Sequence, residues 1–361
     1  MNQWISNLPT YEPGKPIETV ARELGFTNID EIIKVASNEN ELGPSPKAIN
    51  AMIQNANNMH RYPDGGCFYL KEKLAKKLGI TSNHLVFGNG SNELIELLAH
   101  IYLSKESNWV VSQCSFAVYH LAAALFNATT VVAPMDNQFG HDLDAMLSSI
   151  NENTKAVILC NPNNPTGTFL SPQKIKSFLQ KVPSSVLVIV DEAYIEYTQE
   201  DKRYPFINEI LNGRENLIVL RTFSKIYGLA GLRIGYAIAA PSIIALCNKV
   251  RQPFNVNLMA IKAAEVALED DEFIKQAAKI NRDGLDFFEK EFKRLGLEFV
   301  PSYANFILVK TYKGKEIFSR LQQKKIIIRA MDSYKLPDWV RITVGTAKQN
   351  RQIIDELEKL C

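Results

Sequence analysis

The sequence predicts an α/β protein whose larger part is a mainly parallel β-sheet between helices, followed by a smaller α+β unit. Seven short apolar runs lie between residues 84 and 240. Most are apolar throughout, which is typical of strands covered on both faces. Helical patterns separate many of them, and strands alternating with helices favour a parallel sheet. After about residue 245 the pattern changes to a long helical stretch followed by further strand patterns.

A length of 361 residues predicts two domains. We expect an N-terminal arm at 1–35 that belongs to the small domain, a large domain at 36–245 and the small C-terminal domain at 246–361. Hydrophobic residues make up 46% of the chain and charged residues 22%, which is ordinary for a globular protein.

The elements of the large domain can be assigned from residue patterns. The helix expected at 91–103 places Leu94, Leu98, Ile101 and Tyr102 on one face. A second helix begins after Ser171, a favoured N-cap, with Pro172 at its first position. The expected strands are HLVFG (84–88), NWVVS (108–112), TTVVA (129–133), KAVILC (155–160), VLVIVDEA (186–193), NLIVLRTFS (216–224) and GYAIAA (235–240).

The C-terminal part has a different order of elements. A long helical stretch at 257–295 precedes three short strand patterns, and the chain closes with one more helix. This order predicts the smaller α+β domain. The strand patterns are NFILV, KIIIRA and WVRITVG, and the final helix is KQNRQIIDELEKL.

Charge and composition argue against several functions. The net charge is +2, so the charge of the chain does not indicate binding to nucleic acid or to an anionic membrane. No apolar run is long enough to span a bilayer, and the N-terminus lacks a secretory pattern. The five cysteines form no CxxC pair and the histidines no HExxH motif. We therefore expect no metal, no disulfide framework and a cytoplasmic location.

The first candidate motif is GNGSNELIELL at 88–98. Two glycines turn the chain from a strand into a helix whose free N–H groups can hold a phosphate. The pattern is not a dinucleotide fingerprint, because Glu93 occupies the place of the third glycine. No Walker lysine follows either. On these residues alone, a simple strand–helix turn is the stronger interpretation.

Two further motifs follow neighbouring predicted strands. NPNNPTG at 161–167 predicts a rigid turn. This turn either directs an asparagine amide toward a ligand or has only the structural role of ending the strand. The apolar strand before DEAY ends in Asp191. A carboxylate at the end of a buried strand needs a cation or donors, so Asp191 either caps a helix or holds a protonated ring nitrogen. Ligands of open α/β sheets bind at such strand ends.

The fourth motif is RTFSKIYGLAGLRIGY at 221–236, where a lysine stands among groups suited to an anion. Thr222 and Ser224 offer hydroxyls and Arg233 a bidentate guanidinium, which suits phosphate. Lys225, partly desolvated near an arginine, should have a lowered pKa and be a nucleophile near neutral pH. The alternative is a loop lysine between two strands. Together, the four motifs supply the phosphate site, amide, carboxylate and Schiff-base lysine that pyridoxal phosphate needs.

These motifs resemble a known family. NPNNPTG, DEAY and TFSKIYGLAGLRIGY, in this order and spacing, are similar to the fold-type-I pyridoxal-phosphate aminotransferases. YEPGKP, SNENELGPSP, RYPDGG, IIIRA and WVRITVGT resemble its histidinol-phosphate aminotransferase branch. The resemblance covers essentially the whole chain. It implies a large cofactor-binding domain with a mainly parallel seven-stranded sheet, a small α+β domain, and pyridoxal 5′-phosphate as cofactor.

The resemblance also implies a role for each matching residue. Lys225 binds the cofactor covalently and moves a proton, Asp191 keeps the ring nitrogen protonated, and Tyr194 contacts the phenolic oxygen. Tyr62 reaches the cofactor phosphate of the neighbouring subunit, which implies a homodimer with shared sites. Phe116 stacks on the ring or is a core aromatic. The full implied cofactor site is Ser91, Asn92, Phe116, Asn164, Asp191, Tyr194, Thr222, Ser224, Lys225, Arg233 and Tyr62.

The implied reaction transfers an amino group between L-histidinol phosphate and 2-oxoglutarate, a step of histidine biosynthesis. The implied substrate residues are Tyr11, Asn40, Arg329 and Arg341. The arginines alone could also be surface charges at strand ends. Aromatic-amino-acid aminotransferases and threonine-phosphate decarboxylases share much of the pattern and remain alternatives. A cofactor-binding regulator would carry a DNA-binding domain ahead of this fold, so we expect an enzyme that acts on small molecules.

Overall fold

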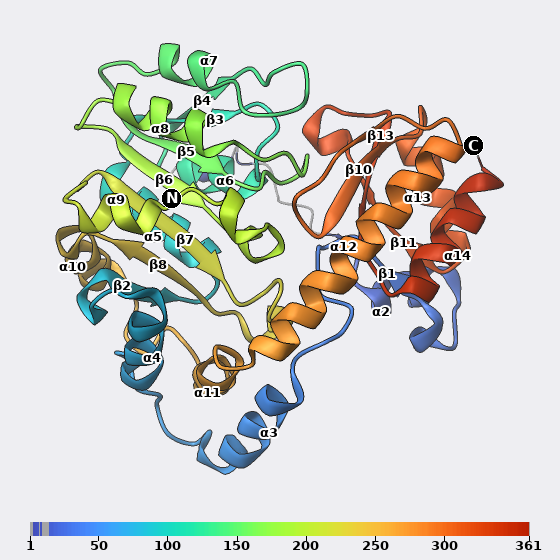
Figure 1. Ribbon diagram of the computed structural model, residues 1–361, viewed down its shortest axis with the longest axis horizontal. Coiled ribbons are helices and arrows are strands. Elements are labelled where there is room, and N and C mark those ends of the chain that lie inside the picture. Colours follow the sequence, from blue (N-terminus) through green and yellow to red (C-terminus); the bar gives the residue numbers. More distant parts are fainter. Residues whose placement is uncertain (1–2, 7, 9–13, 361) are drawn as a thin grey trace.

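The computed structural model describes residues 3–6, 8 and 14–360 of the chain. It has a large unit built on a seven-stranded sheet and a small unit built on a four-stranded sheet, lying side by side (Figure 1). No helix among the described residues is long and apolar enough to cross a membrane.

The elements of the large unit alternate between helix and strand, as the residue patterns predict. In chain order they are α3 (Pro46–Asn55), α4 (Phe68–Leu78), β2 (Leu85–Gly88), α5 (Ser91–Tyr102), β3 (Asn108–Ser112), α6 (Ala117–Leu125), β4 (Thr129–Ala133), α7 (Leu143–Ser148), β5 (Thr154–Cys160), α8 (Pro172–Lys181), β6 (Leu187–Asp191), α9 (Phe206–Leu211), β7 (Leu217–Thr222), β8 (Gly235–Ala239), α10 (Pro241–Val250) and α11 (Leu258–Ala267).

The remaining elements come from the two ends of the chain. They are α1 (Gln3–Ser6), α2 (Ile17–Leu24), β1 (Ile33–Lys34), α12 (Asp271–Arg294), β9 (Phe299–Val300), β10 (Phe306–Lys310), α13 (Gly314–Gln323), β11 (Ile326–Ile327), β12 (Arg329–Ala330), β13 (Trp339–Thr343) and α14 (Ala347–Glu358).

The large sheet has the strand order β2-β8-β7-β6-β5-β3-β4. Only β8 runs antiparallel to its neighbours, and every other pair is parallel. The predicted mainly parallel seven-stranded sheet is therefore confirmed. The predicted start of α8 is confirmed too, since the Oγ of Ser171 accepts a hydrogen bond from the backbone N–H of Lys174 at 3.4 Å.

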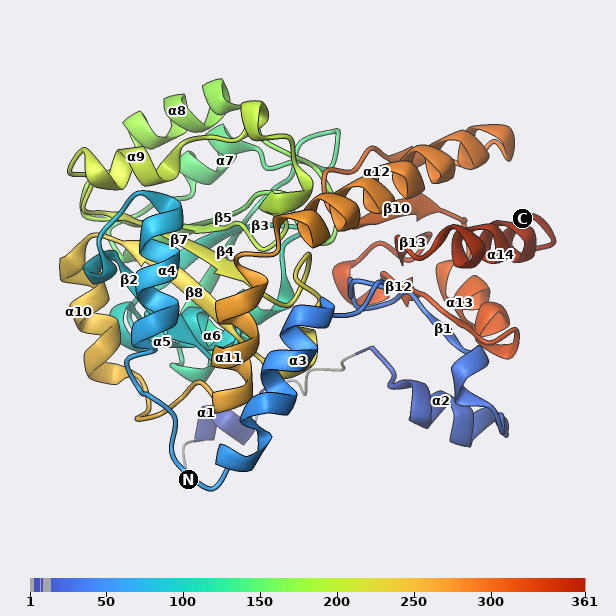
Figure 2. The same cartoon turned by 60° about the horizontal axis from the view of Figure 1, so that its bottom comes forward.

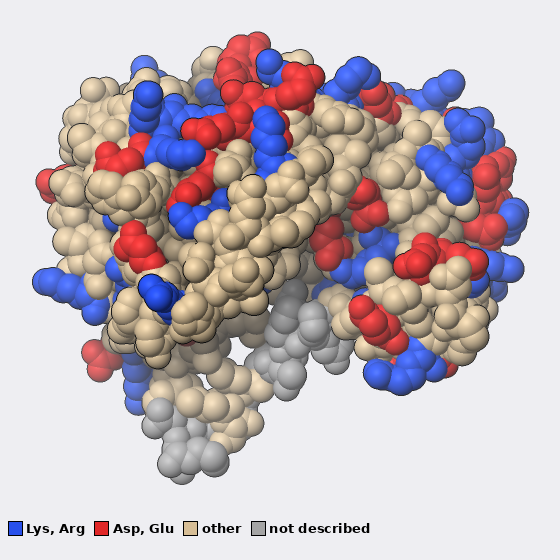
Figure 3. Space-filling view, turned by 90° about the horizontal axis from the view of Figure 1, so that it is seen from below, with Lys and Arg blue, Asp and Glu red and all other residues tan. Residues whose placement is uncertain are grey.

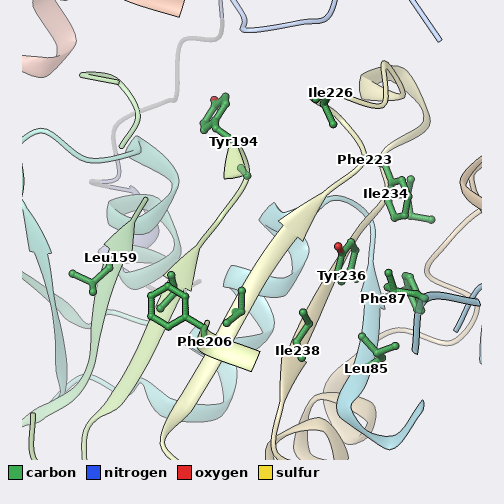
Figure 4. Close-up of a cluster of buried hydrophobic side chains, with 14 of the residues drawn as sticks. Leu85, Phe87, Leu159, Tyr194, Phe206, Phe223, Ile226, Ile234, Tyr236 and Ile238 are labelled. Atoms are coloured by element: carbon green, nitrogen blue, oxygen red, sulfur yellow. The ribbon is translucent and has the colours of Figure 1, made fainter. Parts of the chain in front are cut away.

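Both faces of this sheet are buried, which explains why its strands are apolar throughout. Along β6, Val188 and Val190 belong to the core on one face, whereas Leu187 and Ile189 belong to the core on the other. Figure 4 shows part of the first core, with side chains from several strands gathered on one face. Each fully buried side chain of this size stabilises the fold by about 1.5–3 kcal/mol.

The small unit is held by an antiparallel sheet of order β12-β13-β10-β9. Side chains of α12 and α14, such as Phe288 and Ile353, form its core with those of β10 and β13. The N-terminal segment joins this unit, because β1 pairs in parallel with β11 and Val20 of α2 packs near Ile327.

Two details differ from the sequence-based expectation. The stretch 257–295 forms two helices, and Asp270 separates them with a non-helical backbone. The pattern KIIIRA divides between β11 and β12, which belong to different sheets. Neither break contains the glycine or proline that usually marks one.

The division between the units runs along α12. Side chains of α11 lie in the core of the large unit, and so does Ala277 early in α12. From Leu285 onward, α12 contributes to the core of the small unit. Figure 2 shows α3, α4 and α11 together beside the large sheet. The boundary expected at residue 245 stays a prediction, and we propose that the large unit extends to about residue 277.

Candidate active site

A cavity of about 260 Å³ lies where the strand ends of the large sheet meet the small unit. Most of the residues selected from the sequence line it. These are Ser91, Asn92, Phe116, Asn164, Asp191, Tyr194, Thr222, Ser224, Lys225, Arg233, Arg329 and Arg341. The lining residues that sequence reasoning missed are Gly14, Ala36, Ser37, Asn38, Cys160, Ala193 and Tyr334.

Lys225 enters the cavity from the loop after β7. Its Nζ donates a hydrogen bond to the backbone carbonyl of Ser37 at 3.3 Å. Burial, with a further contribution from the positive charge of Arg341, lowers the pKa of Lys225 to about 8. A lysine with this pKa is partly neutral near physiological pH, and a neutral amine can attack a carbonyl carbon or accept a proton.

Asp191 is the last residue of β6 and is only 2% exposed. One carboxylate oxygen accepts the Tyr119 hydroxyl at 2.8 Å, and the other accepts the backbone N–H of Ala193 at 3.1 Å. Burial raises the pKa of Asp191, while these two hydrogen bonds and the charge of Lys225 oppose the rise. Each carboxylate oxygen has a second acceptor position, so Asp191 can still bind a protonated nitrogen.

Tyr194 lies just beyond β6, and its ring stands beside Lys225. The Lys225 Nζ is 5.5 Å from the centre of this ring. The Tyr194 hydroxyl accepts a hydrogen bond at 2.9 Å from the side-chain amide of Asn38. The backbone N–H of Asn38 in turn donates to the Thr343 hydroxyl in β13 at 3.0 Å. Asn38 therefore connects the tyrosine of the large unit to the small unit.

One end of the cavity is built to receive an anion. Helix α5 begins at Ser91 without a side-chain cap, so the N–H groups of its first turn point outward. Arg233 donates to the Ser224 hydroxyl at 3.4 Å. Gly90 has φ +78, and a Cβ at this position would collide with the Arg233 guanidinium. A helix N-terminus, hydroxyls and an arginine form a phosphate site.

Two arginines face the cavity from the small unit. Arg329 of β12 and Arg341 of β13 are directly opposite each other in the strand register, so both side chains leave the same face. Arg341 is 6% exposed and donates to the Asn164 side-chain oxygen and, at 2.8 Å, to the Ala36 carbonyl. Two guanidiniums at one wall suit an anionic substrate.

Phe116 precedes α6 and lines the cavity, where its ring meets the Tyr119 ring edge to face at 5.8 Å. Part of its side chain also packs against the core on that side of the sheet. The position agrees with either interpretation of this residue, and stacking on the cofactor stays a prediction.

Three selected residues are not brought to the cavity. The Asn40 amide donates to the Ile226 carbonyl at 2.8 Å, so it supports the lysine loop rather than lining the cavity. Tyr62 is 83% exposed and stacks on Phe254 at 4.8 Å. Tyr11 lies outside the described residues.

Tyr119 and Asn38 were missed although each contacts a selected residue. Tyr119 lies three residues after Phe116, which is the N-cap of α6, and the two rings are in contact. That spacing was a usable signal. Asn38 stands within SNENELGPSP, but its contact with Tyr194 joins residues far apart in the chain, which no local pattern reveals.

Known proteins resemble this chain over nearly its whole length. A sequence model of the family described as "Aminotransferase class I and II" matches residues 30–357. The chain belongs to this family. Histidinol-phosphate aminotransferases of Akkermansia muciniphila and Moorella thermoacetica are each 44% identical to it, across 99% of this chain and 98% and 92% of theirs. The crystal structure of the Sinorhizobium meliloti histidinol-phosphate aminotransferase with pyridoxal-5′-phosphate aligns with a TM-score of 0.91 at 27% identity, covering 100% of this chain and 98% of that one.

As a class I and II aminotransferase, the protein uses pyridoxal 5′-phosphate. The cavity fits this cofactor. Buried Asp191 suits a protonated ring nitrogen, Lys225 is an amine with a lowered pKa, and the start of α5 is open to a phosphate. Among the described residues, no cluster of His, Cys, Asp and Glu could hold a metal ion.

Proposed function

We propose that this aminotransferase moves an amino group between L-histidinol phosphate and 2-oxoglutarate, in histidine biosynthesis. The observation that carries the proposal is the pair Arg329 and Arg341, which lie opposite each other and both line the cavity. A phosphate monoester bears close to two negative charges and three acceptor oxygens near neutral pH. The names of the relatives give independent support.

The proposed roles follow from the positions of the side chains. Pyridoxal phosphate supplies an electron sink for the electron pair of the substrate Cα–H bond. Lys225 as a neutral amine would take the proton from Cα of the substrate and deliver it to C4′ of the cofactor. Asp191 holds the proton of the ring nitrogen. Tyr194 and Asn164, which both line the cavity, would contact the phenolic oxygen of the cofactor.

The same wall of arginines must accept both substrates. A carboxylate needs one guanidinium, held by two hydrogen bonds. Because Arg341 is already held by the Asn164 side chain and the Ala36 carbonyl, we propose that it binds an anion in both half-reactions, the α-carboxylate of glutamate in one and the phosphate of L-histidinol phosphate in the other. Arg329 then contributes mainly to the phosphate of the larger substrate.

We further propose that the active enzyme is a homodimer. Large hydrophobic side chains are exposed along and between α3 and α4, and patches of this kind mark interfaces. Figure 3 views the molecule from the side of α3 and shows uncharged surface among groups of both signs. The exposed residues are Ile49, Ile53, Met59, Tyr62, Phe68, Tyr69 and Phe254. A partner on this face would receive Tyr62, as the family resemblance implies.

Two alternatives use the same scaffold. The substrate of an aromatic-amino-acid aminotransferase carries a single carboxylate and no phosphate. A threonine-phosphate decarboxylase releases carbon dioxide instead of transferring the amino group. Two cavity-lining arginines favour a phosphorylated substrate over an aromatic amino acid, but they do not separate the transaminase from the decarboxylase.

The test follows the cofactor absorbance while the purified holoenzyme reacts with one amino donor at a time. L-histidinol phosphate and glutamate should each convert the cofactor to its amine form, and histidinol phosphate should react faster than L-phenylalanine. The Lys225→Ala variant serves as the control for non-enzymatic change. Faster reaction with phenylalanine, or carbon dioxide release from threonine phosphate as the main reaction, would replace this proposal with one of the alternatives.

A further inference from the structure

Tyr119 lies behind Asp191, outside the cavity lining. It belongs to α6, is fully buried and packs in the core on one face of the large sheet. Its hydroxyl is 2.8 Å from the Oδ2 of Asp191. The residue therefore cannot contact a substrate in the cavity, but it contacts the carboxylate that faces the cavity.

The direction of this hydrogen bond follows from the two groups. Burial, and then the charge of Asp191, raises the pKa of Tyr119 well above its usual value, so the phenol stays neutral. An ionised carboxylate only accepts hydrogen bonds. Tyr119 is thus the donor, and a hydrogen bond to a charged acceptor is short and strong.

The surroundings fix the position of the donor. Ala122 and Ala123 of α6 are buried against the sheet, in the same core as Ile158 and Ile189. The second donor, the backbone N–H of Ala193, meets the other carboxylate oxygen at 3.1 Å. Two donors on two oxygens define the plane of the Asp191 carboxylate. They also oppose the rise in the pKa of Asp191 that burial causes.

We propose that Tyr119 is a positioning residue that orients the Asp191 carboxylate and keeps it ionised for the ring nitrogen of the cofactor. The inference rests on the proposed role of Asp191 in this site. Without the hydroxyl, Asp191 keeps one donor in an apolar environment, so its ionised form is less stable. The ring nitrogen would then hold its proton less tightly, and proton removal from substrate Cα would slow.

The test compares Tyr119→Phe with the native holoenzyme, using glutamate as amino donor. We expect kcat to fall roughly ten- to a hundredfold, the factor for losing one hydrogen bond to a charged group. KM should stay within about twofold, because Tyr119 does not line the cavity. At neutral pH the ¹⁵N chemical shift of a labelled cofactor ring should lie closer to the neutral-pyridine value than in the native enzyme, because the shared proton moves toward the Asp191 carboxylate.

Tyr204→Phe is the matched control. Tyr204 is also buried and also donates to a carboxylate, that of Glu209 at 2.6 Å, but it does not line the cavity. Its variant should keep the native kcat and ring-nitrogen ¹⁵N shift. A native ring-nitrogen ¹⁵N shift in Tyr119→Phe would overturn the inference, even if kcat fell through a general structural effect.

A second variant covers the case in which Tyr119→Phe does not fold. Site-specific 3-fluorotyrosine at position 119 keeps the shape and strengthens the donor, so the ¹⁵N shift should move the opposite way, toward the value of a protonated ring nitrogen. An unchanged ¹⁵N shift would contradict the inference. Because glutamate is the donor throughout, a wrong assignment of the phosphorylated substrate leaves these outcomes interpretable.

Discussion

Burial acts on Lys225 and Asp191 in opposite ways that both suit the chemistry. It lowers the pKa of Lys225 to about 8 and so populates the neutral amine. It raises the pKa of Asp191, but hydrogen bonds from Tyr119 and Ala193 oppose the rise. A titratable base and a carboxylate held for a cation therefore share one cavity, with environments that set their separate roles.

The pKa of Lys225 makes the stability of the apo-protein depend on pH. Because this pKa, about 8, lies below the unfolded value of about 10.4, the unfolded chain binds more protons between these pH values. The contribution of Lys225 to the free energy of unfolding should therefore rise with pH across that interval. Lys225→Met should stabilise the apo-protein by about 1–3 kcal/mol at pH 7 and by less at pH 9.5.

Urea unfolding of the apo-protein at the two pH values measures this effect. Lys176→Met, at an exposed position of α8, is the control and should change stability little at either pH. A stabilisation by Lys225→Met that is equal at both pH values would come from lost polarity alone and would contradict a lowered pKa.

Residues with strong local signals were found from the sequence, and residues defined by long-range contacts were not. Lys225, Asp191 and Asn164 stand within recognisable motifs at the ends of strands, and the structure brings them together. Asn38 touches Tyr194 only because the fold brings two distant segments together. Asn40, in the same segment as Asn38, was selected from the resemblance, yet its amide supports a backbone carbonyl instead.

Among the secondary-structure elements, the turn before α5 controls the phosphate end of the cavity. Gly90 combines a positive φ with the close approach of the Arg233 guanidinium. Gly90→Ala should therefore weaken pyridoxal-phosphate binding by at least tenfold, because the added Cβ displaces the Arg233 guanidinium and a hydrogen bond to a charged group contributes about 1.5–3 kcal/mol. Titration of the apo-protein with the cofactor measures the dissociation constant.

Gly213→Ala is the matched control for this effect. Gly213 also has a positive φ, +92, but nothing lies within 4 Å of the added Cβ. It should lower stability through backbone strain without changing cofactor affinity. If both variants bound the cofactor equally well, the approach of Arg233 to Gly90 would have no role in forming the phosphate site.

The β12–β13 pair sets the second anion site. Since Arg329 is opposite Arg341, it can meet the phosphate of a longer substrate. Arg329→Gln should raise KM for L-histidinol phosphate roughly ten- to a hundredfold more than for glutamate, because charge-assisted hydrogen bonds contribute about 1.5–3 kcal/mol. Separate half-reactions measured by cofactor absorbance give the two values. Equal losses for both substrates would mean that the two arginines act as one structural unit.

Strands of the large sheet were predictable because burial on both faces leaves continuous apolar runs. The break between α11 and α12 was not, because LEDDEF contains neither glycine nor proline and each side of it is helical. The change of sheet inside KIIIRA was not predictable either. The strand β11 pairs with β1 near the N-terminus, whereas β12 pairs with β13 near the C-terminus.

For the whole molecule, the cavity exists only because two units meet. Asp191 and Lys225 come from the large sheet, whereas Arg329 and Arg341 come from the small one. Asn38 joins the units, with its amide on Tyr194, its N–H on Thr343 and its carbonyl receiving the Asn305 amide at 3.1 Å. Such an arrangement cannot be read from local sequence, because it depends on the packing of both cores.

The proposed dimer predicts that inactive subunits can complement each other. After subunit exchange, a mixture of Tyr62→Ala and Lys225→Ala homodimers should regain about a quarter of native activity, because half of randomly mixed dimers carry one native site. Exchange is verified separately with differently tagged subunits. Verified exchange without recovered activity would mean that Tyr62 does not serve the partner's site.

Covalent trapping of the cofactor tests the central claim, that the cavity around Lys225 is the active site, most directly. Borohydride reduction of the holoenzyme followed by peptide mapping should find the phosphopyridoxyl group on Lys225, the lysine with the lowered pKa within the cavity. Recovery of the label on any other lysine would contradict the account, because no other position would bring Asp191, the start of α5 and the two arginines around the reacting nitrogen.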